Sequence, residues 1–156
     1  MVTWRVLSEM RPDLAEEGHR LLYQFGVGLA FLATVRRDGG PRVHPMCPLV
    51  TERGLFAFLL PSPKREDLHR DRRYALHSFP SDANENAFYL TGAAWPAPDA
   101  ERPELEAQFL AERGWSSSSD AFGEQELFEF GIERCLHTVT NGHGDPNPTH
   151  IHWRAP

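Results

Sequence analysis

The sequence predicts an α+β protein whose body is an antiparallel β-barrel of six or seven strands, with short helices between its hairpins. Three observations lead to this prediction. Apolar segments of strand length recur along the chain, and turn sequences such as Asp38-Gly39-Gly40 separate them. Helical spacing of apolar residues occurs in only a few places. The regular strand–helix–strand alternation that would indicate a parallel sheet is missing.

Length and composition predict one domain, spanning residues 1–156, with a packed core. The net charge of −6 argues against nucleic-acid binding through a broad basic surface. The first residues contain no long apolar segment, and no segment approaches the roughly 18 apolar residues of a membrane span. We therefore expect a soluble cytoplasmic protein that has neither a membrane nor a nucleic acid as partner. Cys47 and Cys135 are far apart in the chain and are expected to be buried small hydrophobic residues.

The first third of the chain predicts one helix and a three-stranded meander. Apolar residues at helical spacing predict a helix over 12–25, which the following glycines end. Strands are predicted over 29–36, 41–51 and 55–60, because each is apolar and a tight turn separates it from the next.

The rest of the chain alternates short helices with pairs of strands. A charged helix is predicted over 63–71, followed by strands over 74–79 and 87–95. The next helix is predicted over 100–113, with a modest apolar face.

A long-looped hairpin is predicted to close the chain, with strands over 127–140 and 149–154 joined by a loop rich in glycine, asparagine and proline. Between the last helix and this hairpin, Ser116–Ser119 is predicted to be a loop, and we assign it no chemistry.

A candidate anion site lies where the third predicted strand gives way to a helix. Residues 61 to 64 read Pro-Ser-Pro-Lys, and Lys64 is the only lysine of the chain. The start of a helix offers unpaired backbone N–H groups and the positive end of the helix dipole, which favour an anion such as a phosphate. Ser62 would add a hydroxyl and Lys64 a compact positive charge. The simpler interpretation is that Lys64 is a solvated surface residue.

Three segments of the sequence resemble the FMN-binding split-barrel family, the pyridoxamine 5′-phosphate oxidase-like superfamily. They are Phe31–Pro45, Phe56–Leu76 and the closing His152–Arg154. The second is the most specific, because a strand, Ser-x-Lys, a leucine and Arg-Asp-x-Arg follow one another in the family's order. The resemblance implies an antiparallel split β-barrel and a homodimer that holds one flavin in each of two interface clefts.

The resemblance also assigns cofactor-binding roles. Arg42 and Lys64 match the phosphate contacts, with Ser62 beside them as a hydroxyl donor. The resemblance places Val43, His44, Pro45 and Met46 along the isoalloxazine edge, with Leu59 and Leu60 alongside. Trp153 and Arg154 match a closing aromatic and basic pair that approaches the cofactor from the partner chain. The simpler interpretation is that Arg42 forms a surface ion pair.

The resemblance implies an FMN-dependent oxidoreductase acting on a small molecule that the sequence does not identify. No catalytic side chain is assigned, although His44 could tune the flavin or donate a proton to it. Vitamin B6 oxidation is not predicted, because the C-terminal region that grips the phosphate of that substrate has no clear counterpart between Thr149 and Pro156. Cys47 stands where that enzyme has a second basic residue, which makes the expected phosphate site less positively charged. The alternatives are an F420-dependent reductase, suggested by an arginine-rich and lysine-poor composition, and a non-catalytic protein that binds flavin or, less favoured, haem.

Three histidines near the end of the chain raise the question of a metal site. If the final hairpin is symmetric about residues 144 and 145, His137 lies opposite His152, and His150 shares its face. Such a cluster could bind zinc, copper or haem. We favour no metal site, because the register is assumed and no carboxylate or cysteine completes the set.

Overall fold

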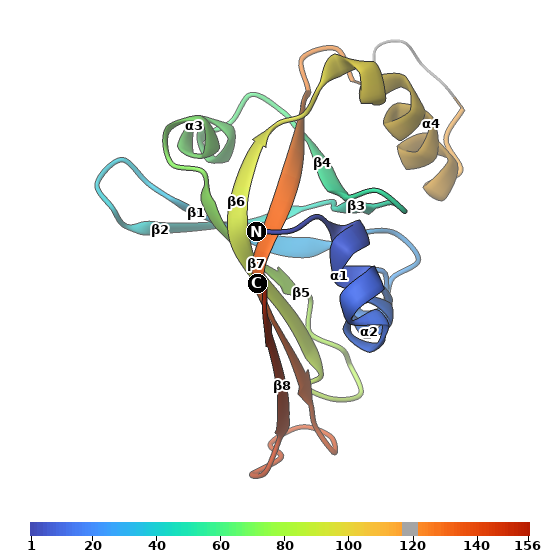
Figure 1. Cartoon of the computed structure of the whole chain (residues 1–156), viewed down its shortest axis with the longest axis vertical. Helices are drawn as coiled ribbons and strands as arrows, with labels where there is room; N and C mark the ends of the chain where they lie inside the picture. The colour runs from blue at the N-terminus through green and yellow to red at the C-terminus, as the bar shows by residue number, and fades with distance from the viewer. Residues whose placement is uncertain (117–121) are drawn as a thin grey trace.

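One strongly curled antiparallel sheet forms the body of the protein in the computed structural model, which describes residues 1–116 and 122–156 (Figure 1). The strands are β1 (Ala30–Val35), β2 (Pro41–Met46), β3 (Leu49–Val50), β4 (Leu55–Leu59), β5 (Arg73–Ser78), β6 (Ala87–Pro96), β7 (Glu126–Val139) and β8 (Thr149–Arg154). Their order is β2-β1-β5-β6-β7-β4-β3, and β8 also pairs with β7. The predicted α+β class and the antiparallel split barrel are confirmed.

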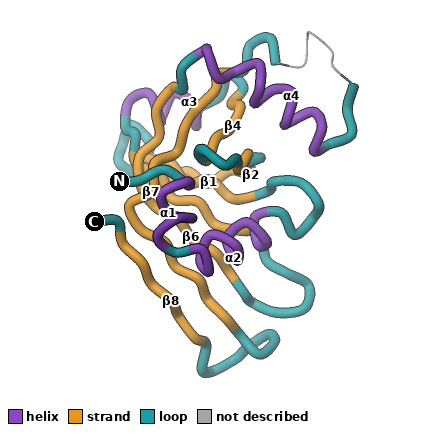
Figure 2. The backbone as a smooth tube through the Cα atoms, turned by 45° about the vertical axis from the view of Figure 1, so that its right-hand side comes forward, coloured by secondary structure: helices purple, strands orange, loops and turns teal. Residues whose placement is uncertain are grey.

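Four short helices lie around the sheet (Figure 2): α1 (Trp4–Met10), α2 (Pro12–Leu22), α3 (Pro63–Arg70) and α4 (Arg102–Glu112), the last preceded by a 3₁₀ turn over Asp99–Glu101. The helix α1 was not predicted. Thr3 caps it by accepting a hydrogen bond from the Val6 backbone N–H at 3.4 Å, and Trp4 and Leu7 are buried one turn apart. Its seven residues are too few for their periodicity to stand out in the sequence. No helix of the described residues is long and apolar enough to cross a membrane.

The second predicted strand is two strands in the structure, which is why the described residues hold eight strands. The predicted strand is interrupted at Cys47 and Pro48, which lie between β2 and β3. At this break the backbone of Gly28 lies so close that a Cβ atom there would be 1.9 Å from the Pro48 carbonyl oxygen. Only glycine allows this approach, because any other side chain would clash with the backbone.

The antiparallel pairings of the predicted meander are confirmed in two parts, because β1 pairs with β2 and β3 pairs with β4. β1 lies between β2 and β5, and β4 lies between β3 and β7. All five residues of β4 are buried, so this strand belongs inside the sheet and needs a partner on each side. Its second partner comes from a segment far along the chain, which local patterns cannot identify.

The core has two parts. The larger part fills the barrel and is covered by α1 and α2; its bulkiest fully buried members include Phe88, Phe128 and Phe130. The smaller part lies under α4, where Leu105 packs with Phe56 and Phe58.

β7 is the longest strand and pairs with more elements than any other strand of the described residues. Along one edge it pairs with β6 over almost its whole length. Along the other edge it pairs first with β4 and later with β8. Between these two stretches the backbone of Val2 exchanges hydrogen bonds with Ile132 at 2.8 and 2.7 Å.

The final hairpin forms as predicted, but its register differs by one residue. His137 lies opposite Ile151, whereas His150 and His152 lie opposite Thr138 and Leu136. A shift of one residue moves a side chain to the other face of a strand pair. His137 is therefore on the face opposite the other two histidines, and the hypothesis of a three-histidine cluster is wrong.

Two smaller expectations complete the comparison. Cys135 is buried as expected, whereas Cys47 is only partly buried. The prediction for the serine tract falls largely on residues 117–119, which lie outside the described residues.

Candidate cofactor site

Arg42 and Lys64 come together where β2 passes α3, through two reciprocal contacts. From β2, Arg42 Nε donates a hydrogen bond to Asp67 Oδ2 on α3 at 2.7 Å. From α3, Lys64 Nζ donates to the backbone carbonyl of Pro45 on β2 at 3.3 Å. Asp67 lies three residues after Lys64, so strand and helix are tied together at both ends of one helical turn.

The buried carboxylate of Asp67 holds Arg42 in place. Asp67 is 3% exposed and also accepts hydrogen bonds from Thr34 Oγ1 at 2.9 Å and Arg70 Nη1 at 3.1 Å. Burial raises the pKa of Asp67, but these hydrogen bonds outweigh it and leave the pKa below its ordinary value. Arg42 contributes its Nε to this cluster, and its two terminal nitrogens have no protein partner within the described residues.

Lys64 is half-buried at the first turn of α3. Burial lowers the pKa of its ammonium group, and the neighbouring Cys47 partly offsets this effect. Ser62 occupies the N-cap position, but its hydroxyl donates to the Leu60 carbonyl at 2.8 Å and makes no capping hydrogen bond. The Ser62 backbone carbonyl instead accepts hydrogen bonds from the Arg65 and Glu66 N–H groups, which leaves the Lys64 N–H as the open donor of the first turn within the described residues.

The five predicted residues of β2 are divided between two faces of the sheet. Arg42, His44 and Met46 pair with Thr34, Leu32 and Ala30, which are buried on the inner face. Val43 and Pro45 point to the outer face, and Val43 is 60% exposed. A single surface cannot contain all five side chains, because successive residues of a strand point in opposite directions.

Val43 and Pro45 belong to a wider apolar surface on the outer side of the sheet, which we call the outer patch. Val43 and Pro45 pair with Ala33 and Phe31, and the ring of Phe31 stacks on Phe79 at 4.0 Å between centroids. Phe25 packs edge-on against Phe79 and is itself 52% exposed. The outer patch thus consists of Phe25, Phe31, Ala33, Val43, Pro45 and Phe79.

The two leucines at the end of β4 differ in accessibility. Leu59 is 1% exposed and belongs to the core, so its side chain does not reach the surface. Leu60 is 59% exposed and lies between β4 and the start of α3. Of these two side chains, only that of Leu60 is available to a ligand near Lys64.

Trp153 and Arg154 lie at the other end of the sheet. Both are on β8, which β1, β5, β6 and β7 separate from β2 in the strand order. Trp153 packs against the main core, and Arg154 is exposed, 3.6 Å from Glu133. Within one chain, the sheet does not bring this pair to the junction of β2 and α3.

Comparison with known proteins identifies the fold. No protein-family model matches the chain, and no curated protein matches its sequence. Among solved structures, a Clostridium acetobutylicum protein related to general stress protein 26 of B. subtilis, of the pyridoxinephosphate oxidase family, superposes with a TM-score of 0.60 and 13% identity over 96% of this chain and 95% of its own. The chain has the split-barrel fold of the pyridoxamine 5′-phosphate oxidase-like superfamily.

Two solved structures of proteins with other functions also superpose on the chain. A heme-binding protein from Mycobacterium smegmatis superposes with a TM-score of 0.65 and 17% identity, over 92% of this chain and 59% of its own. An F420 reductase superposes with a TM-score of 0.53 and 19% identity, over 69% of this chain and 87% of its own. At these identities the similarity shows the fold alone.

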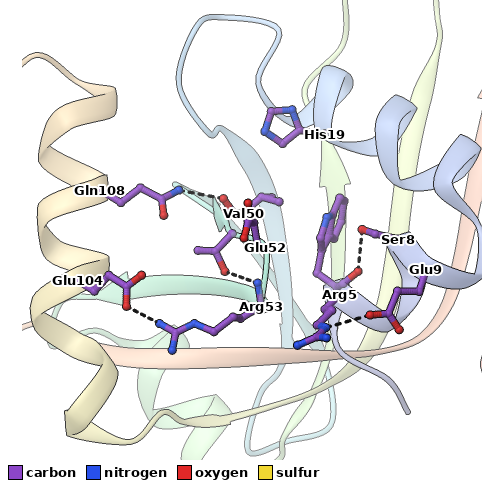
Figure 3. A pocket seen from close by; sticks show the side chains of 11 residues that line it. Arg5, Ser8, Glu9, His19, Val50, Glu52, Arg53, Glu104 and Gln108 are labelled. Atoms are coloured by element: carbon purple, nitrogen blue, oxygen red, sulfur yellow. Dashed lines mark hydrogen bonds and ion pairs between the residues drawn. The ribbon is translucent and has the colours of Figure 1, made fainter.

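The cavity drawn in Figure 3 contains none of the predicted site residues. It has a volume of about 1130 Å³ and lies between α1, the turn joining β3 to β4, and α4. Its two arginines are already paired, Arg5 with Glu9 at 2.9 Å and Arg53 with Glu104 at 2.8 Å. The lining offers no uncompensated positive charge to a phosphate.

A smaller cavity of about 430 Å³ lies directly beside Arg42 and is lined by Arg36, Arg37, Asp38 and Asp67 as well. Sequence reasoning did not single out Arg36, Arg37 or Asp67. The spacing of Asp67 from Lys64, one helical turn, was the available signal, but in the sequence this carboxylate looked like one of several charges on an exposed helix.

Proposed function

We propose that the protein is a homodimeric oxidoreductase that binds a phosphorylated flavin-type cofactor, FMN or the deazaflavin F420, in two clefts between the subunits. The observation that carries the proposal is the paired anchoring of Arg42 by Asp67 and of Lys64 by the Pro45 carbonyl. This arrangement presents two positive groups about one helical turn apart along α3. The split-barrel fold, shared with a pyridoxinephosphate oxidase family protein and an F420 reductase, supports it.

The junction of β2 and α3 suits a phosphate group. The terminal nitrogens of Arg42, the ammonium group of Lys64 and the Lys64 backbone N–H supply hydrogen-bond donors. Charge-assisted hydrogen bonds of this kind contribute about 1.5 to 3 kcal/mol each. Because Asp67 is 3% exposed and bound by three donors, it orients Arg42 without occupying the surface where a phosphate would bind.

The apolar outer patch suits a second copy of the chain. Val43 and Phe25 are 60% and 52% exposed, which is unfavourable for an isolated subunit. The patch is continuous with β2, an edge strand whose outer edge has no partner in the described residues. A partner subunit on this patch would bury it, and could bring its own Trp153 and Arg154 to the cofactor.

In this proposal the chain binds and orients, and the cofactor supplies the redox chemistry. When bound, a flavin provides hydride or electron transfer. Arg42, Ser62 and Lys64 would hold its phosphate, and the exposed Leu60 beside them would exclude water. His44 is half-buried on β2 and shares the inner face with Arg42.

F420 is the second candidate cofactor, favoured by the cavity beside Arg42. F420 carries a longer anionic side chain than FMN. The cavity of about 430 Å³ would place Arg36 and Arg37 along such a side chain. Arg37 has no ion-pair partner within the described residues, so its guanidinium group is available to an anionic group of the cofactor.

Titration of the purified protein with FMN, riboflavin and F420 tests the proposal. We expect FMN or F420 to bind more tightly than riboflavin, which lacks the phosphate. Lys64→Ala should weaken the phosphorylated cofactor about 10-fold or more, equivalent to about 1.4 kcal/mol, and leave riboflavin unchanged. Arg53→Ala is the matched control, because it removes a positive charge from the large, separate cavity.

Three results would contradict the proposal or parts of it. Equal affinity of Lys64→Ala and wild type for FMN and F420 would remove the phosphate assignment. A monomer in sedimentation velocity, with cofactor bound, would remove the interface clefts. Tight cofactor binding without reduction by NADPH, NADH or dithionite would make the protein a binding module and not an enzyme.

A further inference from the structure

A third cavity, separate from the two described above, lies between α2 and the β7–β8 hairpin. Its volume is about 350 Å³. Figure 2 shows α2 lying against the strands at a distance from α3, which carries Lys64. Seven residues line the cavity: Asp13, Leu14, Glu17, Asn86, His137, Val139 and Ile151. None of them belongs to the proposed cofactor site.

The imidazole of His137 forms the floor of this cavity and lacks a hydrogen bond. His137 is 5% exposed, and its Nε2 atom is buried without a partner within the described residues. The nearest carboxylate oxygen, Glu17 Oε2 on α2, is 3.8 Å away, which is too far for a hydrogen bond. A buried polar atom without a partner is rare in native proteins and calls for an occupant.

The charged groups around His137 favour a neutral imidazole and a positively charged ligand. Burial lowers the pKa of His137; Glu17 and Asp13 oppose this effect, and Arg20 adds to it. Both carboxylates line the cavity, whereas their partners Arg20 and Arg11, at 2.7 and 2.6 Å, do not. An anion would meet two carboxylates on entering and is disfavoured.

Apart from Asn86, whose side-chain oxygen accepts hydrogen bonds from Thr140, the remaining walls are aliphatic. Leu14 comes from α2, Val139 from β7 and Ile151 from β8. A ligand that satisfies the whole lining therefore has a positively charged hydrogen-bond donor at one end and a short hydrocarbon chain at the other.

We propose that this cavity binds a small aliphatic amine, with its ammonium group between His137 Nε2 and the Glu17 carboxylate and its chain against Leu14, Val139 and Ile151. Because these two atoms are 3.8 Å apart, a nitrogen beside them can lie about 2.9 Å from each. One N–H donates to the neutral imidazole and another to the carboxylate. The site is independent of the flavin proposal, because it shares no residue with it.

Nuclear magnetic resonance titration with n-butylammonium chloride tests this proposal. We expect saturable shifts of the His137 ring proton and of the Leu14 and Ile151 methyl groups, at about millimolar concentration for so small a ligand. Sodium butanoate and n-butanol should not produce them. Glu17→Gln and His137→Gln should each weaken binding about 10-fold or more.

The matched controls lie close by. Glu16→Gln alters an exposed carboxylate on the same helix, and His143→Gln alters an exposed histidine in the loop of the same hairpin; both should bind as the wild type does. If His137→Gln fails to fold, the affinity of Glu17→Gln for n-butylammonium decides the question. The Glu17 side chain is partly exposed, so its substitution should leave the fold intact. Unsaturable shifts, shifts elsewhere on the protein, equal binding by Glu17→Gln, or His137 signals that indicate a bridging water only would overturn the proposal.

Discussion

The two faces of the β1–β2 hairpin differ in how well one chain covers them. On the inner face, Ala30, Leu32 and Met46 are buried in the core, and Thr34 and Arg42 bind the buried carboxylate of Asp67. On the outer face, Phe31 and Val43 are apolar and accessible, and Val43 is 60% exposed. An accessible apolar face of this kind is not expected of a monomeric barrel. One chain therefore buries its inner face by itself, whereas its outer face exposes apolar side chains that a partner subunit would cover.

The largest expected effect comes from the inner face. Leu32 is fully buried on β1, so Leu32→Ala should lower the free energy of unfolding by about 3 kcal/mol through lost burial and a new cavity. Val43→Ala, on the next strand but facing outward, should change the stability of the monomer by less than about 0.5 kcal/mol. Urea unfolding at low protein concentration measures both. Similar losses in the two variants would show that the faces do not differ.

A smaller loss is expected when the inner polar cluster is broken. Asp67→Asn removes the charge that Arg42 and Arg70 share and should cost about 2 kcal/mol. The control is Glu66→Gln, one residue earlier on α3 and exposed, which should cost almost nothing. Unchanged urea midpoints for Asp67→Asn would mean that the cluster does not stabilise the fold.

The outer face is tested through association. Val43→Glu places a charge in the outer patch and should weaken the proposed dimer about 10-fold or more, which corresponds to about 1.4 kcal/mol. Sedimentation velocity over a range of concentrations gives the dissociation constant. Glu52→Gln, outside the outer patch, serves as the control. A variant that dimerises as well as wild type would place the interface elsewhere.

The smallest effect is the pH dependence that Asp67 contributes. Its pKa in the folded protein is below the ordinary value of about 4, so the stability it provides is complete above that value and is lost as pH falls through the folded pKa. Arg73 lowers the pKa of Asp71 to about 2, so Asp71 titrates in the same range. Urea midpoints from pH 7 to pH 2 should therefore fall less steeply in Asp67→Asn than in wild type. Parallel curves would contradict the assignment.

Local chemistry predicted the strands and helices well, and failed where distant segments decide. The last strand was predicted with its observed bounds, and the predicted helix over 63–71 extends only one residue beyond α3. The pairing of β4 with β7 was missed, because nothing in a short apolar segment specifies a partner so far along the chain.

The candidate site divides in the same way. The motif order led to Arg42 and Lys64, and the structure places both at the junction of β2 and α3. The role of Asp67 was not predictable, because its burial depends on how α3 packs on the sheet. The register of the final hairpin was also not predictable, because its loop allows two turn centres, and the choice decides the face of His137.

The pairing of Val2 with Ile132 has a consequence for how the protein opens. The first residues of the chain occupy the gap between β4 and β8 along one edge of β7. Release of this short segment would leave the Ile132 amide unprotected while the stretches on either side remain paired. Hydrogen–deuterium exchange at Ile132 should then follow a local fluctuation of the N-terminus, and its neighbours should exchange only when the sheet itself unfolds.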